Sequence, residues 1–293
     1  AHWGSEGMQN LTPLWLLKYL PNMLACHITI VHDCQGPSSA ITCCEAASAL
    51  AIAESRRVIQ RGDADACLSG GAEDRVNPLA LYRQHCTGRL ADSDGSGDMS
   101  SLVQPFSEHA TGTVIGEGGG IMIVESAVSC EARGGSPWCT IDGIGCRQSF
   151  ADSPLDADPQ AIASAITRAL EESDSTIDEI DVIVPLGSGI RQVDSAERDG
   201  LHTIFKDRLD SIPTITTIPY TGNCMAGNSG ISIGIAAKVL REQKLPARLG
   251  AEQTPGIDAG TCDATDMNIR NILCITAGEG GQCVAIVLGR ISS

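Results

Sequence analysis

The sequence predicts an α/β fold in which helices cover the faces of β-sheets. Apolar runs of strand length alternate with longer, helix-like segments through both halves of the 293 residues. Glycine and proline residues separate these segments, as expected for the turns between them. Hydrophobic residues make up 42% of the chain, which is enough to bury one large core or two ordinary ones.

The first half opens on a helix signal, because Thr12 can cap a helix whose first position is Pro13. The helix expected after residue 45 is apolar nearly all round and is therefore predicted to be buried. In chain order we expect a helix over 12–21, a strand over 27–32, a helix over 45–60, a strand over 64–69, a helix over 78–90, and a glycine-rich turn and strand over 118–125. The acidic stretch 92–98 is interpreted as a solvated connection, with calcium binding as the weaker alternative because the acidic spacing of a calcium loop is missing.

A second unit starts after Gly134 and Gly135, so we divide the chain into residues 1–134 and 135–293. In this half we expect a strand over 139–145, a helix over 159–173, a strand over 182–185, a helix over 194–209, a strand over 214–218, a helix over 223–241, and a closing pair of strands over 272–277 and 282–288. The alternation of strands and helices again predicts layers, with helices on the sheet faces.

Charge and composition narrow the classes of partner. Asp and Glu outnumber Lys and Arg by 36 to 20, so the formal charge is −16, and we expect neither nucleic acid nor a membrane surface as a partner. The most apolar stretch is interrupted by Lys18, Pro21 and His27, and no secretory signal pattern is present. The 13 Cys are spread without a disulfide framework and form no Cys-x-x-Cys pair, which favours a reduced, cytoplasmic protein. A metal site needs clustered ligands and is not expected, and no cofactor is expected either. Because the chain begins with Ala1, we expect a fragment or a processed product.

Residues 36–48 carry the most informative motif, Gly-Pro-Ser-Ser-Ala-Ile-Thr-Cys-Cys-Glu-Ala-Ala-Ser. Small residues lead here directly into a helix, and such a junction can hold a nucleophile beneath backbone N–H groups. The segment resembles the active-site elbow of β-ketoacyl-acyl-carrier-protein synthases, which reads roughly Gly-Pro-x-x-x-Val-Ser-Thr-Ala-Cys-Ala-x-Gly. Aligned without a gap, the family's nucleophilic Cys falls at Glu45.

Further segments resemble the same family in the expected order. They are Gly-Asp-Ala-Asp-Ala-Cys-Leu-Ser-Gly-Gly-Ala-Glu at 62–73, Pro-Phe at 105–106 followed by Gly-Glu-Gly-Gly-Gly at 116–120, Pro-Leu-Gly-Ser-Gly-Ile at 185–190 with Asp194 and Glu197, Gly222-Asn223, and Ala-Gly-Glu-Gly-Gly at 277–281. The resemblance covers nearly the whole chain, although it starts inside the family's first half. It implies a thiolase-like layered αβαβα fold that is incomplete at its N-terminus.

The resemblance also implies that the charged and nucleophilic groups of the family are replaced. The family's first catalytic His falls at Leu186, its second at Asn223, its Lys at Ile218, the Arg of the Pro-Phe segment at Ala110, and the gating Phe of the glycine turn at Glu279, between Gly278 and Gly280. Condensation needs a thiolate to accept the acyl group and two donors that stabilise the enolate. Glu45 is a poor nucleophile, Leu186 donates nothing, and Asn223 can donate one hydrogen bond.

Three functions follow from the resemblance. The first is a ketosynthase-like protein of fatty-acid or polyketide biosynthesis that no longer condenses and acts as a partner subunit, as a chain-length factor does. The second is an active enzyme, either a malonyl-acyl-carrier-protein decarboxylase that uses Glu45 and Asn223 or an acyltransferase that uses Cys44. The third is a truncated, non-functional remnant.

The resemblance implies two kinds of partner. One is the acyl carrier protein, and the other is a dimer partner, either a second copy or an active ketosynthase. Dimer contact is expected at the strand that includes Ala40 and Ile41. Arg56, Arg57 and Arg61 form a basic cluster at a helix end, where they either contact an acidic carrier protein or match the helix dipole.

Overall fold

A computed structural model describes residues 6–10, 12–93, 101–150, 152–249, 257 and 263–291. Its largest sheet has the strand order β3-β8-β7-β4. The strands are β3 (Thr140–Gln148), β4 (Val182–Val184), β7 (Asn271–Ala277) and β8 (Gln282–Gly289). β8 pairs antiparallel with β3 and with β7, whereas β4 runs parallel to β7. The predicted acidic connection over 92–98 lies mostly outside the described residues.

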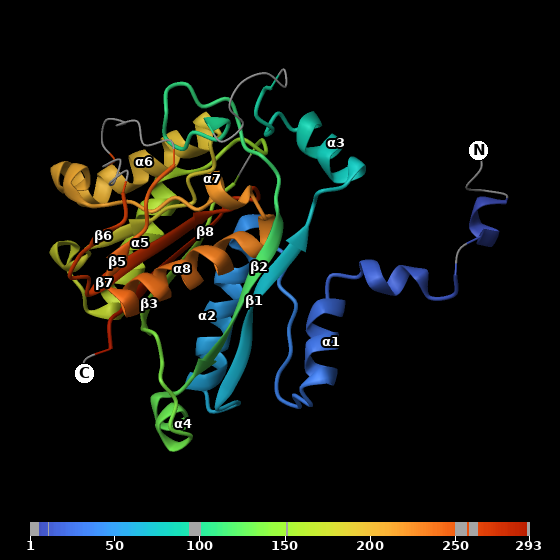
Figure 1. Cartoon of the computed structure of the whole chain (residues 1–293), viewed down its shortest axis with the longest axis horizontal. Coiled ribbons are helices and arrows are strands. Elements are labelled where there is room, and N and C mark those ends of the chain that lie inside the picture. Colours follow the sequence, from blue (N-terminus) through green and yellow to red (C-terminus); the bar gives the residue numbers. More distant parts are fainter. Residues whose placement is uncertain are drawn as a thin grey trace.

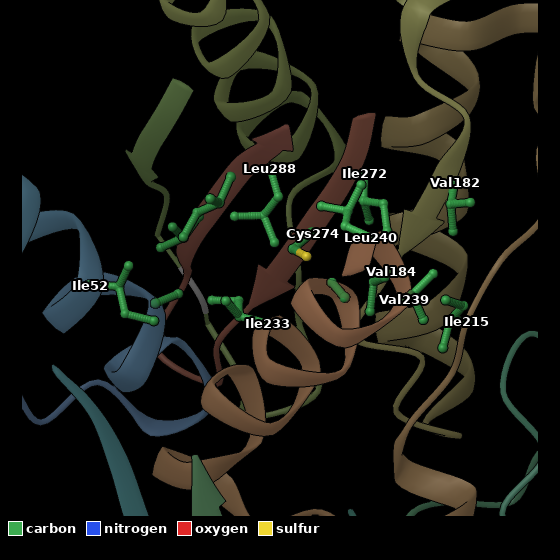
Figure 2. Packing of buried hydrophobic residues seen from close by; sticks show 14 of the residues in the cluster. Ile52, Val182, Val184, Ile215, Ile233, Val239, Leu240, Ile272, Cys274 and Leu288 are labelled. Carbon is green, nitrogen blue, oxygen red and sulfur yellow. The ribbon is translucent and has the colours of Figure 1, made fainter. Parts of the chain in front are cut away.

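Helices cover both faces of this sheet (Figure 1). The covering helices are α2 (Ala47–Gln60), α5 (Pro159–Ser173), α6 (Arg191–Phe205) and α8 (Asn228–Glu242). Successive side chains of β7 point to opposite faces, so Ile272 and Cys274 join the core under α2 and α8, while Leu273 and Ile275 join the core under α5 and α6. Figure 2 shows the first of these cores, which includes Ile52 of α2 and side chains of α8. Both faces are buried, which explains why the central strands β7 and β8 are apolar at most positions.

A second sheet consists of β1 (Ala66–Asp74) and β2 (Glu117–Glu125), which pair antiparallel. α2 and α8 contact both sheets and therefore form the layer between them. Backbone meets backbone where β2 lies against α8, because a Cβ on Gly120 would stand 2.4 Å from the carbonyl oxygen of Gly230. This close approach allows only glycine at the crossing. The layers confirm the predicted α/β fold with helices on the sheet faces.

The remaining elements surround these layers. They are the helices α1 (Met23–Val31), α3 (Pro78–Cys86), α4 (Ala127–Ala132) and α7 (Ile218–Thr221), the two-residue strands β5 (Lys244–Leu245) and β6 (Thr265–Asp266), and 3₁₀ turns at Gly7–Asn10, Trp15–Tyr19, Cys44–Ala46, Ile177–Glu179, Lys206–Ser211 and Met225–Gly227. α4, β5 and β6 were not predicted, because each is too short to produce a periodic pattern.

The predictions for residues 12–32 were wrong. Residues 27–31 of the expected strand lie in helix α1, which ends there, and the helix expected over 12–21 is reduced to the 3₁₀ turn Trp15–Tyr19. An alternating run as short as 27–32 does not separate a strand from a helix by its pattern alone. Within the described chain no strand pairs with this segment, and a helix satisfies its own backbone hydrogen bonds without a neighbour. Figure 1 shows α1 beside the β1–β2 sheet, with the chain before it leading away from the body.

Two other expected strands are also absent from the described structure. Residues 36–43, which lead into the elbow, have no regular secondary structure. The strand expected over 214–218 is reduced to one bridge between Thr214 and Ile183, because helix α7 already begins at Ile218. The other predicted elements agree with the structure to within about five residues, and α5 matches its predicted range over 159–173.

Candidate functional site

The elbow places Glu45 at the start of a buried helix. Cys44 has a left-handed φ of 46°, the 3₁₀ turn Cys44–Ala46 follows, and α2 continues from Ala47. The Oγ of Ser229 in α8 donates to the carbonyl oxygen of Glu45 at 2.8 Å and accepts from the N–H of Ala49 at 3.0 Å. These contacts fix the elbow against α8 and leave the carboxylate of Glu45 inside the protein.

Donors from three distant segments surround that carboxylate. The side-chain amide of Asn223 donates to Oε1 at 3.1 Å, and the backbone N–H of Glu279 donates to Oε2 at 3.1 Å. The guanidinium of Arg89 forms a buried ion pair with Oε1. Three sequence-predicted positions, 45, 223 and 279, therefore meet in space, and the Glu45 carboxylate accepts the hydrogen bonds.

Arg89 was not predicted as a site residue. It follows α3, and its backbone pairs with Thr113, whose N–H donates to the Arg89 carbonyl at 2.8 Å. Its Nη1 donates to the carbonyl oxygen of Pro154 at 2.7 Å, and its Nε lies 4.0 Å from Oε2 of Glu279. A buried carboxylate needs a cationic partner, so Glu45 in an apolar segment was the one signal that pointed to such a residue.

Asn223 has few hydrogen-bonding groups left for a ligand. Its Oδ1 accepts from the N–H of Met225 at 2.8 Å, and its own N–H donates to Val114 at 2.6 Å. Its carbonyl accepts from the N–H of Gly116 at 3.0 Å. The amide that was predicted to donate to a substrate therefore donates to Glu45 instead.

The positions of two further family residues lie in an apolar cluster. Leu186 and Ile218 are both fully buried and pack with Val103, Ile190 and Val193. The resemblance places a His and a Lys at these two positions. Neither aliphatic side chain can donate a proton or a hydrogen bond, so neither can assist the reaction of a thioester.

Two buried carboxylates hold the loop that carries Leu186. Glu197 accepts from the N–H groups of Leu186 at 2.8 Å and Gly187 at 3.0 Å. Asp194 accepts from the N–H groups of Ser188, Gly189 and Phe106 at 2.8–3.0 Å. Burial raises the pKa of both carboxyl groups, that of Glu197 to about 8. Their oxygens face backbone N–H groups, which gives them a positioning role.

The glycine turn lies beside the elbow. A Cβ on Gly278 would stand 3.2 Å from the carbonyl oxygen of Cys43, and the Gly278 N–H donates to Gln282 at 2.7 Å. Gly280 lies within the same turn, where its carbonyl oxygen accepts from the side chain of Gln148 at 2.8 Å. The structure therefore brings the turn of Gly278, Glu279 and Gly280 next to position 45.

The environment of Cys44 opposes its ionisation. Burial, together with the nearby carboxylates of Glu45 and Glu279, raises the pKa of the Cys44 thiol to about 12. A thiol reacts with thioesters as the thiolate, so a raised pKa makes it a weak nucleophile at neutral pH.

The remaining predicted residues lie outside the site. Ala110 is buried, and its carbonyl accepts from Arg191 at 3.3 Å. In the basic cluster, Arg56 pairs with Glu172, and Arg61 pairs with Glu54 and Asp63. These intramolecular pairs favour the interpretation of the cluster as a helix end rather than a docking patch.

The described part of the chain contains no group of three or more His, Cys, Asp or Glu side chains placed to hold a metal. Among the same residues, no helix has the length and apolar character that crossing a membrane requires.

Two family models match this chain. The beta-ketoacyl synthase N-terminal domain matches residues 2–129, and the beta-ketoacyl synthase C-terminal domain matches residues 138–252. The chain belongs to the beta-ketoacyl synthase family. This membership confirms the resemblance drawn from the motifs.

Relatives with curated names agree with this assignment. The actinorhodin polyketide beta-ketoacyl synthase 2 of Streptomyces coelicolor is 29% identical over 98% of this chain and 70% of its own length. A 3-oxoacyl-[acyl-carrier-protein] synthase 2 of Staphylococcus aureus is 24% identical over 96% of this chain and 70% of its own length.

Solved structures of the family share the fold. A type II polyketide acyl-carrier protein in complex with its ketosynthase matches with a TM-score of 0.90 and 22% identity, over 96% of this chain and 69% of that one. The ishigamide ketosynthase/chain length factor matches with a TM-score of 0.78 and 24% identity, over 87% of this chain and 61% of that one. These matches confirm the thiolase-like α/β fold for this beta-ketoacyl synthase family member.

Proposed function

We propose that this chain is a non-condensing ketosynthase-like protein of fatty-acid or polyketide biosynthesis that serves as the partner subunit of an active synthase. One observation carries the proposal. At position 45, to which the resemblance assigns the family's nucleophilic Cys, the side chain is a buried carboxylate whose two oxygens already accept from Arg89, Asn223 and the N–H of Glu279. A carboxylate is not a nucleophile that accepts an acyl group as a thioester, and the groups that donate to it are not free to bind a substrate.

The second requirement of condensation, stabilisation of the enolate, supports the same conclusion. The enolate that forms when malonyl loses carbon dioxide needs hydrogen-bond donors near its oxygen. Leu186 and Ile218 supply none, and the amide of Asn223 donates to Glu45. The N–H of Glu279 also donates to Glu45, so it is not available to stabilise an enolate. The residues therefore fit a retained fold with lost transfer chemistry.

The partner role draws on two further observations. The structural matches include a ketosynthase with its acyl-carrier protein and a ketosynthase/chain length factor, and we infer a similar assembly for this chain. Within the described part of the chain, no backbone hydrogen bond reaches residues 36–42, and most of this segment is exposed. An extended, unpaired segment is suited to pair with a strand of another subunit.

The test uses the full chain with acylated and with malonylated carrier protein, and mass spectrometry of both proteins. We expect no acyl group on the chain and no decarboxylated product, while an intact 3-oxoacyl-[acyl-carrier-protein] synthase gives both in parallel. Acylation of Cys44 would contradict the proposal and support the acyltransferase. Product without acylation would support the decarboxylase.

A second experiment tests the partner role directly. The chain is expressed alone and together with an active ketosynthase, and its solubility and co-purification are compared. We expect the two proteins to co-purify at a fixed ratio. A chain that remains insoluble in both cases would support the remnant instead.

A further inference from the structure

The site around Glu45 has no room for a substrate. The side chain of Glu45 and the whole of Asn223 have an exposed fraction of 0%, and Arg89 is 1% exposed. No water-sized space therefore adjoins the carboxylate. An acyl thioester must bring its carbonyl carbon within about 3–3.5 Å of a nucleophile. At position 45 that volume is occupied by protein.

Arg89 is the largest of the groups that fill the space beside the carboxylate. Its guanidinium lies between the Glu45 carboxylate on one side and the carbonyl oxygen of Pro154, 2.7 Å away, on the other. Its stem is anchored by the backbone pairing of Arg89 with Thr113. The arginine thus spans from the segment after α3 to the elbow and to the segment before α5.

We propose that Arg89 is a plug that closes the acyl site independently of the residue at position 45. The inference rests on the proposed non-condensing function and deepens it. Acyl transfer would then be prevented both by the lack of a nucleophile at position 45 and by the side chain that fills the acyl site. Restoring the family's nucleophile with Glu45→Cys alone leaves Arg89 bound to Pro154 and beside the Glu279 carboxylate, 4.0 Å away. The site stays closed until the arginine is shortened as well.

The test compares three variants of the full chain, E45C, E45C/R89A and E45C/R89M. Each is incubated with octanoyl-pantetheine, and peptide mapping measures octanoylation at position 45 apart from the 13 native cysteines. In the reaction, the introduced thiolate attacks the thioester carbonyl carbon and forms a new S–C bond. The C–S bond to pantetheine breaks, and the pantetheine thiolate takes up the proton that the introduced thiol released.

We expect E45C/R89A to be octanoylated at least tenfold faster than E45C. E45C/R89M is the volume-matched control and should remain as slow as E45C, because methionine refills much of the space without a charge. Equal rates for E45C and E45C/R89A would overturn the plug. That result would leave the proposed function intact, because the natural chain carries Glu45.

A second measurement does not need the arginine variants to fold. The E45C chain is alkylated with iodoacetamide and with its N-octyl derivative, and labelling at position 45 is compared with labelling at the exposed Cys34 of the same molecule. The plug predicts that the long reagent labels position 45 at least tenfold more slowly than Cys34. Comparable labelling of both positions by the long reagent would overturn it.

Discussion

The two sheets of this protein differ in how completely they are covered. In the four-stranded sheet, seven of the eight residues of β8 are buried, and helices pack on both faces. In the β1–β2 sheet, α2 and α8 cover one face, while Leu68, Ile121 and Ile123 are exposed on the strands. A groove of about 380 Å³ separates these strands from α1, which has no buried residue.

The difference shows that the distribution of apolar residues along a strand reflects how many faces of its sheet are buried. β7 and β8 are apolar at most positions because each face has its own core. β1 and β2 contain glycine and polar residues at several positions, and only one residue in each strand is buried. Buried apolar contacts are therefore concentrated in the four-stranded sheet, and the elbow is one of several places where segments of the β1–β2 layer pack against α8.

The largest expected effect comes from removing the cation that pairs with Glu45 at the elbow. Arg89→Ala leaves the Glu45 carboxylate buried without its cation, which should lower the free energy of unfolding by about 3–5 kcal/mol. Denaturant unfolding of the full chain measures this change. Arg61→Ala removes exposed ion pairs and is the control, for which we expect little change. Similar values for both variants would show that the buried Arg89–Glu45 pair does not stabilise the elbow.

A pair of isoleucine truncations tests the contrast between the sheets directly. Ile272→Ala in β7 removes a fully buried side chain and should cost about 2–5 kcal/mol of unfolding free energy. Ile123→Ala in β2 removes a side chain that is 61% exposed, so we expect a change within about 0.5 kcal/mol. The same unfolding curves give both values. A large cost at Ile123 would mean that another surface covers β2 in solution.

Substitutions of two glycines of α8 test how closely this helix packs against the β1–β2 sheet. A Cβ at Gly230 would meet the Gly120 carbonyl oxygen at 2.5 Å, so Gly230→Ala should destabilise the protein by about 1–3 kcal/mol. Gly234 lies one turn further along with nothing within 4 Å of such a Cβ. Gly234→Ala should stabilise the protein by about 0.5–1 kcal/mol through helix propensity. Changes of the same sign would contradict the close approach of β2 and α8, and thermal unfolding distinguishes the cases.

The smallest effect concerns the reactivity of one thiol at the junction. With a pKa of about 12, Cys44 carries a thiolate fraction of about one in ten thousand at pH 8. Its alkylation by iodoacetamide should therefore be far slower than that of the exposed Cys34 and Cys86, and should keep rising up to about pH 12. Mass spectrometry after labelling at several pH values gives the three rates. Rapid labelling of Cys44 at pH 8 would contradict the raised pKa and support Cys44 as a nucleophile.

Much of the fold could be predicted from the sequence. The helix over 159–173 was predicted closely because its apolar residues recur with the helical period, and the strands over 272–288 because each is a short apolar run of strand length. The segment 27–32 was assigned wrongly, because its short alternating run fits a strand as well as a helix. The strand expected over 214–218 failed because Ile218 begins a helix.

The candidate site was predicted in part. The motifs identified positions 45, 223 and 279, and the structure brings all three together. Arg89 was missed, although it contributes the only cation among the contacts described at Glu45. A lone arginine after a helix has no local pattern, and its partner lies 44 positions away.

The sequence by itself determined the α/β class, the order of most elements and the positions that the resemblance assigns to the family's catalytic groups, because periodicity and residue identity are local properties. Only the tertiary structure decided that Arg89 lies against Glu45, that Leu186 and Ile218 share one apolar cluster, and that one sheet is covered on both faces while the other is not. These outcomes depend on which distant segments pack together. A charged residue in an apolar segment indicates only that it needs an oppositely charged partner. Which residue supplies that charge depends on how the distant segments pack.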